Sequence, residues 1–75
     1  MNELDRITLN LEICHGKPCI RGMRWPVEVI LDMLAAGMST AEILSDHQEL
    51  EIADIIAALK YARLLVSGQT IRQAA

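Results

Sequence analysis

The chain has 75 residues, of which 52% are hydrophobic, with one Trp, one Tyr and no Phe. Its formal net charge of −3 disfavours strong non-specific binding to nucleic acid. The sequence has no apolar run of about 18 residues and its N-terminus is acidic, so we predict no membrane span, no signal peptide and a cytoplasmic protein with reduced cysteines. One small domain cannot hide so many apolar side chains, which predicts a homodimer or a permanent protein partner.

The first third of the chain predicts a short β-ribbon. Residues 6–11 alternate polar and apolar side chains, as a short strand does. Residues 18–21 and 23–25 can supply a second extended piece, with Gly22 at a bend between them. We therefore expect a ribbon and loop over residues 5–25 of a single domain that spans residues 1–75.

Three helices are expected over residues 26–67. Pro26 suits the start and Gly37 the C-terminal cap of a helix over 26–36. Ser39 and Glu42 form a capping-box pattern before a short helix over 40–46. A third helix is expected over 52–67, ended by Gly68, with a frayed tail over 68–75. This order, with a tight turn after the second helix, fits a mainly α helix-turn-helix unit.

The third helix is apolar on nearly all sides. Its main stripe is Ile52, Ile55, Ile56 and Leu59, and other apolar residues fill most of the remaining circumference. A helix of this kind is buried on more than one side, which predicts an interface. Trp25, just before the first helix, is either a core plug or an interface anchor. The candidate interface residues are Trp25, Ala57, Tyr61, Leu64 and Leu65.

The cations are unevenly placed along the chain. Residues 14–25 carry three Lys or Arg and no acid, whereas residues 39–54 carry five acids and no cation. An alternative for Arg21 and Arg24 is an internal brace, in which one of them pairs with Glu28 or Asp32. Lys60 and Arg63 are alternatively a solvated helix face. The candidate contacts with nucleic acid or a partner are Lys17, Arg21, Arg24, Lys60 and Arg63.

Cys14, His15 and Cys19 are residue types found in zinc sites and at nucleophilic centres. The two cysteines are five positions apart, without the paired spacing and the nearby fourth ligand of a structural zinc site. Cys14 and His15 are adjacent and lack an evident orienting partner. The glycines lack P-loop spacing. We therefore expect packing roles for the cysteines, no bound metal or cofactor, and no enzymatic activity.

The segment Asp5–Ala62 resembles the domain-of-unknown-function family 433 (DUF433). The resemblance rests on residues 6–7, 14–22, 24, 26–27, 34–39, 42–44, 54–55 and 57–59. It implies a homeodomain-like fold and an antitoxin-type binding module that neutralises a PIN-like ribonuclease toxin and can also bind its own promoter DNA. The alternatives are a stand-alone helix-turn-helix DNA-binding regulator and a small structural or metal-binding protein.

The chain departs from the usual family pattern at several positions. Leu11 replaces a Pro, Met23 and Trp25 replace a Thr and an aliphatic residue, and residues 47–48 replace a Tyr-Pro pair. Glu51 replaces a Thr that would cap the third helix, a loss worth about 1 kcal/mol. Because Glu51 puts negative charge at the helix end that a helix-turn-helix presents to DNA, it disfavours DNA reading by that helix.

Overall fold

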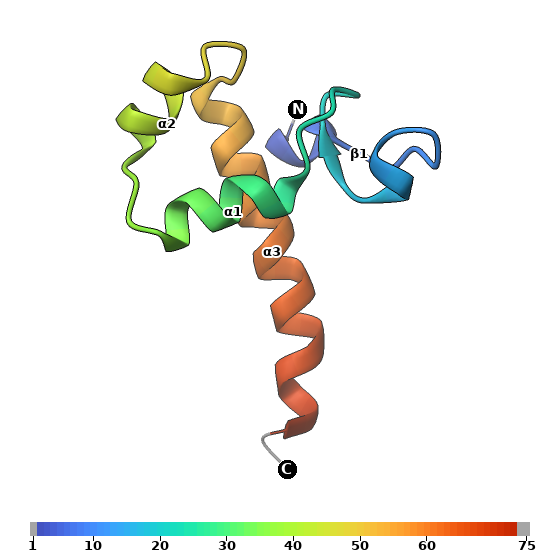
Figure 1. Ribbon diagram of the computed structural model, residues 1–75. Helices are drawn as coiled ribbons and strands as arrows, with labels where there is room; N and C mark the ends of the chain where they lie inside the picture. Colours follow the sequence, from blue (N-terminus) through green and yellow to red (C-terminus); the bar gives the residue numbers. More distant parts are fainter. Residues whose placement is uncertain (1, 74–75) are drawn as a thin grey trace.

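The computed structural model describes the backbone of residues 2–73 and the side chains of residues 2–68. A small N-terminal ribbon precedes three helices, α1 (Val27–Ala35), α2 (Thr40–Asp46) and α3 (Ile52–Gln73) (Figure 1). The predicted mainly α architecture with a short ribbon is therefore confirmed. Of the helices in the described part of the chain, none combines the length and the apolar character needed to cross a bilayer.

The ribbon is shorter than predicted. β1 (Ile7–Thr8) pairs antiparallel with β2 (Cys19–Ile20), so the strand expected over residues 6–11 covers only two of them. The chain turns at Asn10, whose side-chain oxygen accepts a hydrogen bond from the Glu12 N–H, and such Asx turns end strands. The predicted bend at Gly22 is confirmed, since Arg21 and Gly22 both have positive φ, 48° and 70°.

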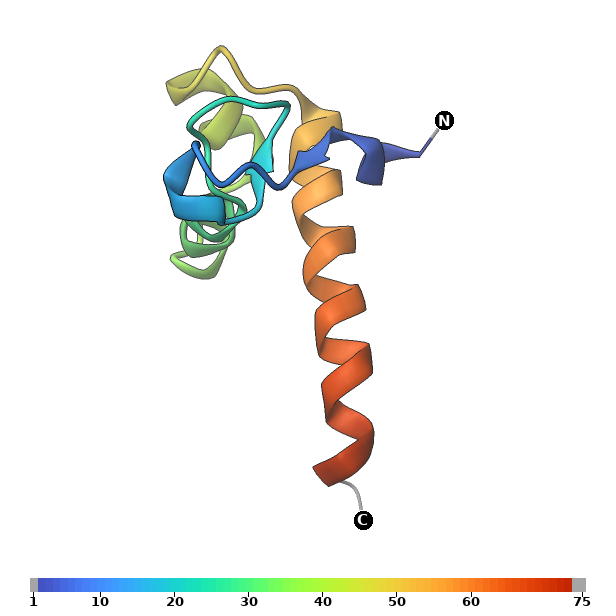
Figure 2. The ribbon, with the colours of Figure 1, turned by 90° about the vertical axis from the view of Figure 1, so that its right-hand side faces the viewer.

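Two 3-10 turns, η1 (Glu3–Arg6) and η2 (Cys14–Gly16), were not predicted because segments of three or four residues are too short to show a helical period. Asn2 caps η1, with Asp5 completing a capping box. Figure 2 shows η1 against the first part of α3, on the side away from α1 and α2. The first part of α3 therefore lies between η1 and the rest of the body.

The first two helices lie within one residue of their predicted bounds. Gly37 has a φ of 95° after α1, and the Met38 N–H donates to the Met33 carbonyl, which is the left-handed cap expected there. Ser39 and Glu42 form the predicted capping box at the start of α2. These local signals worked because each involves residues within five positions of one another.

The core lies where the ribbon, α1, α2 and the start of α3 meet. Leu50, in the turn between α2 and α3, points inward as expected and is 4% exposed. The buried residues that form this core are Ile20, Val27, Ile30, Ile43, Leu50, Ile55 and Ala58.

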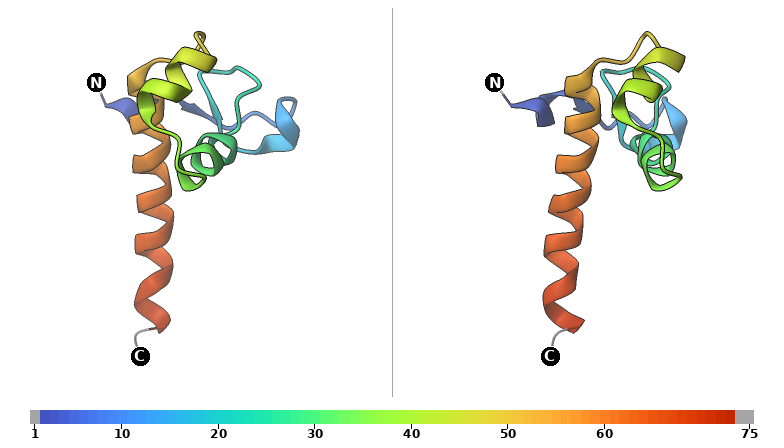
Figure 3. Two further views of the ribbon diagram at one scale, coloured as in Figure 1. Left: turned by 60° about the vertical axis from the view of Figure 1, so that its left-hand side comes forward. Right: turned by 90° about the vertical axis from the view of Figure 1, so that its left-hand side faces the viewer.

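Helix α3 is longer than predicted and projects from the body. Gly68 does not end it, because its φ is not positive and the helix continues to Gln73. A single glycine inside a helix costs about 1 kcal/mol and does not by itself end the helix. Residues 74–75 of the predicted tail lie outside the described residues. Both views in Figure 3 show the C-terminal part of α3 standing clear of the other elements.

Candidate partner-binding site

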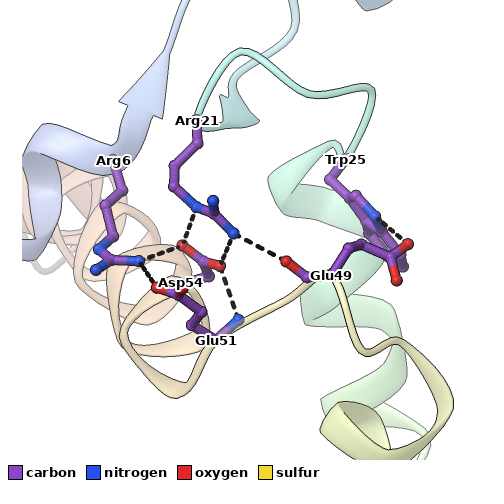
Figure 4. A network of polar contacts seen from close by, with 6 residues as sticks. All are labelled: Arg6, Arg21, Trp25, Glu49, Glu51 and Asp54. Carbon is purple, nitrogen blue, oxygen red and sulfur yellow. Dashed lines mark hydrogen bonds and ion pairs between the residues drawn. The ribbon is translucent and has the colours of Figure 1, made fainter.

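A buried carboxylate fixes the start of α3. Asp54, the third residue of the helix, is 0% exposed and accepts four hydrogen bonds (Figure 4). Its Oδ1 accepts from Arg6 Nη1 at 2.9 Å and Arg21 Nε at 3.1 Å. Its Oδ2 accepts from Arg21 Nη2 at 2.9 Å and the Glu51 N–H at 2.8 Å. The Glu51 carboxylate pairs with Arg6 at 2.7 Å. We call these four residues the Asp54 cluster.

The hydrogen bonds of the Asp54 cluster keep the carboxylate charged. Burial acts to raise the pKa of Asp54, but hydrogen bonds from Arg21, the Glu51 backbone and Arg6 hold that pKa below its ordinary value of 3.8. The hydrogen bonds of Arg6 to the Glu51 and Asp54 carboxylates raise the pKa of Arg6, and those of Arg21 to Asp54 raise the pKa of Arg21. Among the described side chains, every buried nitrogen or oxygen atom has a hydrogen-bond partner. The cluster is thus a satisfied ion network that ties η1 and the ribbon to α3.

The internal brace expected from Arg21 or Arg24 to α1 is wrong in its partner. Arg21 contacts Asp54 and the Glu49 carbonyl oxygen, because the tight turn at residues 21–22 brings its side chain to the N-terminus of α3. Glu28 is paired with Lys17 instead, at 2.6 Å. Arg24 is exposed, and within residues 2–68 it has no hydrogen bond or ion pair of its side chain.

The Asp54 cluster also sets which face of α3 is buried. With Asp54 turned toward the body, Ile55 and Ala58 enter the core. The main stripe expected on the helix is therefore wrong in three of its four members: Ile52, Ile56 and Leu59 are 50%, 36% and 48% exposed. Hydropathy alone predicts that those residues are buried. In the structure the Asp54 cluster and the small alanines pack against the body instead, so the neighbouring face of α3 is the buried one.

The candidate interface residues separate into three groups. Ala57 is 0% exposed within the chain itself and has no surface left for a partner, which corrects that assignment. Trp25 and Tyr61 are partly buried and pack against the core. Leu64 and Leu65 are 50% and 51% exposed on the projecting part of α3. We call the surface formed by Leu64, Leu65 and the exposed part of Tyr61 the distal face.

Trp25 closes the core near the turn before α3. Its indole Nε1 donates to Glu49 Oε2 at 2.9 Å, and its ring meets His47 edge-to-face with centroids 4.8 Å apart. A backbone hydrogen bond at Glu49 and the contact from Trp25 hold the pKa of Glu49 below its ordinary value. Trp25 and His47 are thus in direct contact beside the turn that precedes α3.

The five candidate contact cations do not gather on one surface. Lys17, Arg21 and Lys60 face carboxylates from three different elements, α1, α3 and η1. Lys60 pairs with Glu3 at 2.7 Å. Arg63 is exposed on the projecting part of α3. Including Arg6, four of the six Lys and Arg within residues 2–68 are in intramolecular ion pairs.

The two cysteines lie at the edge of the ribbon. Cys19 is 1% exposed, and burial, followed by the neighbouring Cys14 thiol, raises the pKa of Cys19, so this thiol is unreactive at neutral pH. Cys14 is partly buried in η2, next to the exposed His15. Within the described residues, no group of three or more His, Cys, Asp or Glu side chains is placed to hold a metal ion.

Comparison with known proteins gave one family. No curated protein and no solved structure matches the chain. The family described as "Protein of unknown function (DUF433)" matches residues 7–62. This range contains Arg21, Glu51 and Asp54 of the Asp54 cluster, and it ends before Leu64 and Leu65. Because the match covers well over half of the sequence, the chain belongs to the DUF433 family.

Proposed function

We propose that this protein is an antitoxin-type binding module that holds a PIN-like ribonuclease toxin on the distal face of α3. The toxin class follows from the resemblance of the chain to antitoxin-type members of its family. The observation that carries the proposal is the half-exposed pair Leu64 and Leu65 on a helix that projects from the folded body.

The residues of the distal face have the spacing of a helix that binds in a groove of a partner protein. Tyr61, Leu64 and Leu65 are spaced i, i+3 and i+4, the anchor spacing by which an amphipathic helix docks in an apolar groove. Transfer of the exposed half of each leucine out of water is worth about 1 kcal/mol. A partner that covers this face therefore gains affinity without any rearrangement of the body.

The charge distribution favours a protein partner over DNA. A protein that binds the phosphate backbone needs free cations on one surface. Here four of the six described cations are already paired, and Glu51 and Asp54 sit at the start of α3. A helix-turn-helix would present this end to DNA, where Glu51 is exposed and Arg6 and Arg21 are already paired with carboxylates. Promoter binding therefore has weaker support than toxin binding.

We also propose that the working unit is a homodimer. Besides the distal face, α3 exposes Ile52, Ile56 and Leu59, which neither the body nor the distal face uses. Two separate apolar faces on one helix suit two different neighbours, a second copy and a partner protein.

The test is co-expression with the product of the adjacent open reading frame, followed by co-purification and a ribonuclease assay. We expect a stable complex without ribonuclease activity, and activity of the neighbour when it is made alone. The variant Leu64→Ser/Leu65→Ser should lose the complex.

The matched control is Leu9→Ser/Leu11→Ser, which removes two leucines that are 67% and 87% exposed but lie in the loop after β1. This control should keep the complex. A neighbour that is not nuclease-like, or a complex that tolerates the α3 variant, contradicts the proposal. Tight binding to promoter DNA at low salt, lost steeply as salt rises, would support the regulator alternative instead.

A further inference from the structure

A second apolar row runs along α3 on the side opposite the distal face. With Arg63 as its single polar member, this row follows sequence spacings of 4, 3, 4 and 3, the heptad pattern of two-helix packing. Successive residues are about 100° apart around a helix, so Leu64 and Leu65 point away from this row. We call its four apolar residues, each between 36% and 56% exposed, the dimer strip: Ile52, Ile56, Leu59 and Val66.

We propose that two copies of this chain pack antiparallel along their dimer strips, with Leu59 of each copy at the twofold axis. This inference rests on the homodimer of the proposed function and is independent of its toxin. The strip extends about 21 Å along the helix at 1.5 Å per residue. Two such strips and their flanking side chains bury on the order of 1,000 Å², the lower limit of a specific interface.

Charge decides between the two possible helix directions. In a parallel pair, the two Arg63 side chains meet within an otherwise apolar seam, where like charges repel. In an antiparallel pair centred on Leu59, Arg63 lies beside the partner's Ile56, near the start of the partner's α3. The two Arg63 side chains are then far apart, and the like-charge repulsion of the parallel arrangement is absent.

Each residue of the dimer strip is at least 36% exposed in the single chain. Ile55 and Ala58 face the core on one side of the helix, and Lys60 faces η1 on another. The strip lies between these covered faces, from the first turn of α3 to its projecting part. The distal face points the other way, so a dimer built in this manner can still bind a partner protein.

Disulfide trapping with single cysteines tests the direction of the pair. In a Cys14→Ser background, where Cys19 stays because it is 1% exposed, Leu59→Cys should cross-link to itself under mild oxidation. Val66→Cys should not cross-link to itself, but it should cross-link to Ile52→Cys in a mixture of the two. Self-linking of Val66→Cys without the mixed product would overturn the antiparallel arrangement while leaving a homodimer.

Sedimentation equilibrium tests the strip itself. Leu59→Glu should raise the dimer dissociation constant by about 100-fold or more, since it places a charge in the seam. Leu64→Ser/Leu65→Ser should leave that constant unchanged, and circular dichroism checks that both variants fold. A monomer at millimolar concentration, or a dimer that Leu59→Glu does not weaken, overturns the inference. Loss of the toxin complex with an intact dimer would overturn only the proposed function.

Discussion

The proximal part of α3, which contains Asp54 to Ala58, and its distal part, which contains Leu64 to Val66, are both rich in apolar residues. They differ in how much of their surface the rest of the chain covers. In the proximal part, Ile55 and Ala58 are buried in the core and Asp54 is held by two arginines. In the distal part, Leu64, Leu65 and Val66 are each at least half exposed. The first turns of α3 therefore pack into the core, whereas its later turns project from the body with apolar side chains exposed.

This difference shows that side-chain hydropathy alone does not identify the core of a small protein. The orientation of the proximal part is fixed by a charged residue, Asp54, whose hydrogen bonds hold its side of the helix against the body. The distal part has equally apolar residues with nothing of this chain beside them. Apolar surface that the fold leaves uncovered is therefore available for binding, which is the basis of both proposals above.

The largest expected effect comes from breaking the Asp54 cluster. Asp54→Ala should lower the free energy of unfolding by about 3–5 kcal/mol, because it removes the buried acceptor of four hydrogen bonds, three of them from charged arginines. Urea denaturation followed by circular dichroism measures it. Asp46→Ala, an exposed aspartate at the end of α2, is the control and should change stability little. Equal losses for the two variants would mean that the cluster does not anchor α3.

A pair of substitutions in α3 compares the two parts directly. Ile55→Ala should cost about 2–4 kcal/mol of stability, since it opens a cavity in the core. Leu65→Ala should change stability by no more than about 0.5 kcal/mol, because its side chain packs on nothing in the body. Denaturation at low protein concentration keeps association from contributing. A loss from Leu65→Ala that approaches the loss from Ile55→Ala would show that the distal part belongs to the folded core.

Lowering the pH should weaken the anchoring of α3 by Asp54. The pKa of Asp54 in the folded chain lies below its ordinary value of 3.8, so the unfolded chain binds its proton first as the pH falls. The stability contributed by Asp54 is therefore complete above about pH 5 and is lost progressively below about pH 4. The stability difference between the wild type and Asp54→Asn should shrink in that range, as measured by urea denaturation from pH 7 to pH 3. A difference that stays constant down to pH 3 contradicts this assignment.

The smallest expected effect is at the exposed ion pair that joins the two terminal segments. Lys60 and Glu3 are only 2.7 Å apart, but both side chains are well exposed to solvent. Such pairs are screened by water and contribute little. Lys60→Met should leave the melting temperature unchanged within error in a thermal scan. A clear drop would show that η1 is held to α3 mainly by this pair and not by the Asp54 cluster.

The sequence predicted the parts of the fold that depend on neighbouring residues. The capping box of Ser39 and Glu42, the cap at Gly37 and the bend at Gly22 all act over a few positions, and all three are present. The Asp54 cluster could not be found in the same way. Arg6 and Asp54 are 48 positions apart, and no periodicity links them.

The candidate binding site was predicted only in part, because contacts between distant residues determine which side of α3 faces the body. Leu64 and Leu65 were singled out as apolar residues in excess of a small core, and in the structure they are 50% and 51% exposed. Ala57 was misassigned because a small residue on a nearly all-apolar helix gives no sign of which side faces the body. The signal that could have identified the buried side is the aspartate at the third position of the helix, because a carboxylate there caps the helix and can accept hydrogen bonds from arginines elsewhere in the chain.

Hydrogen exchange in dilute solution, resolved along α3 by mass spectrometry, tests the central claim most directly. If the proximal part belongs to the body and the distal part is a free docking element, amides of residues 55–60 should exchange slowly and those of residues 64–68 quickly. Addition of the partner protein should then slow exchange in the distal part. Equal, strong protection along the whole helix in the dilute chain alone would contradict the account.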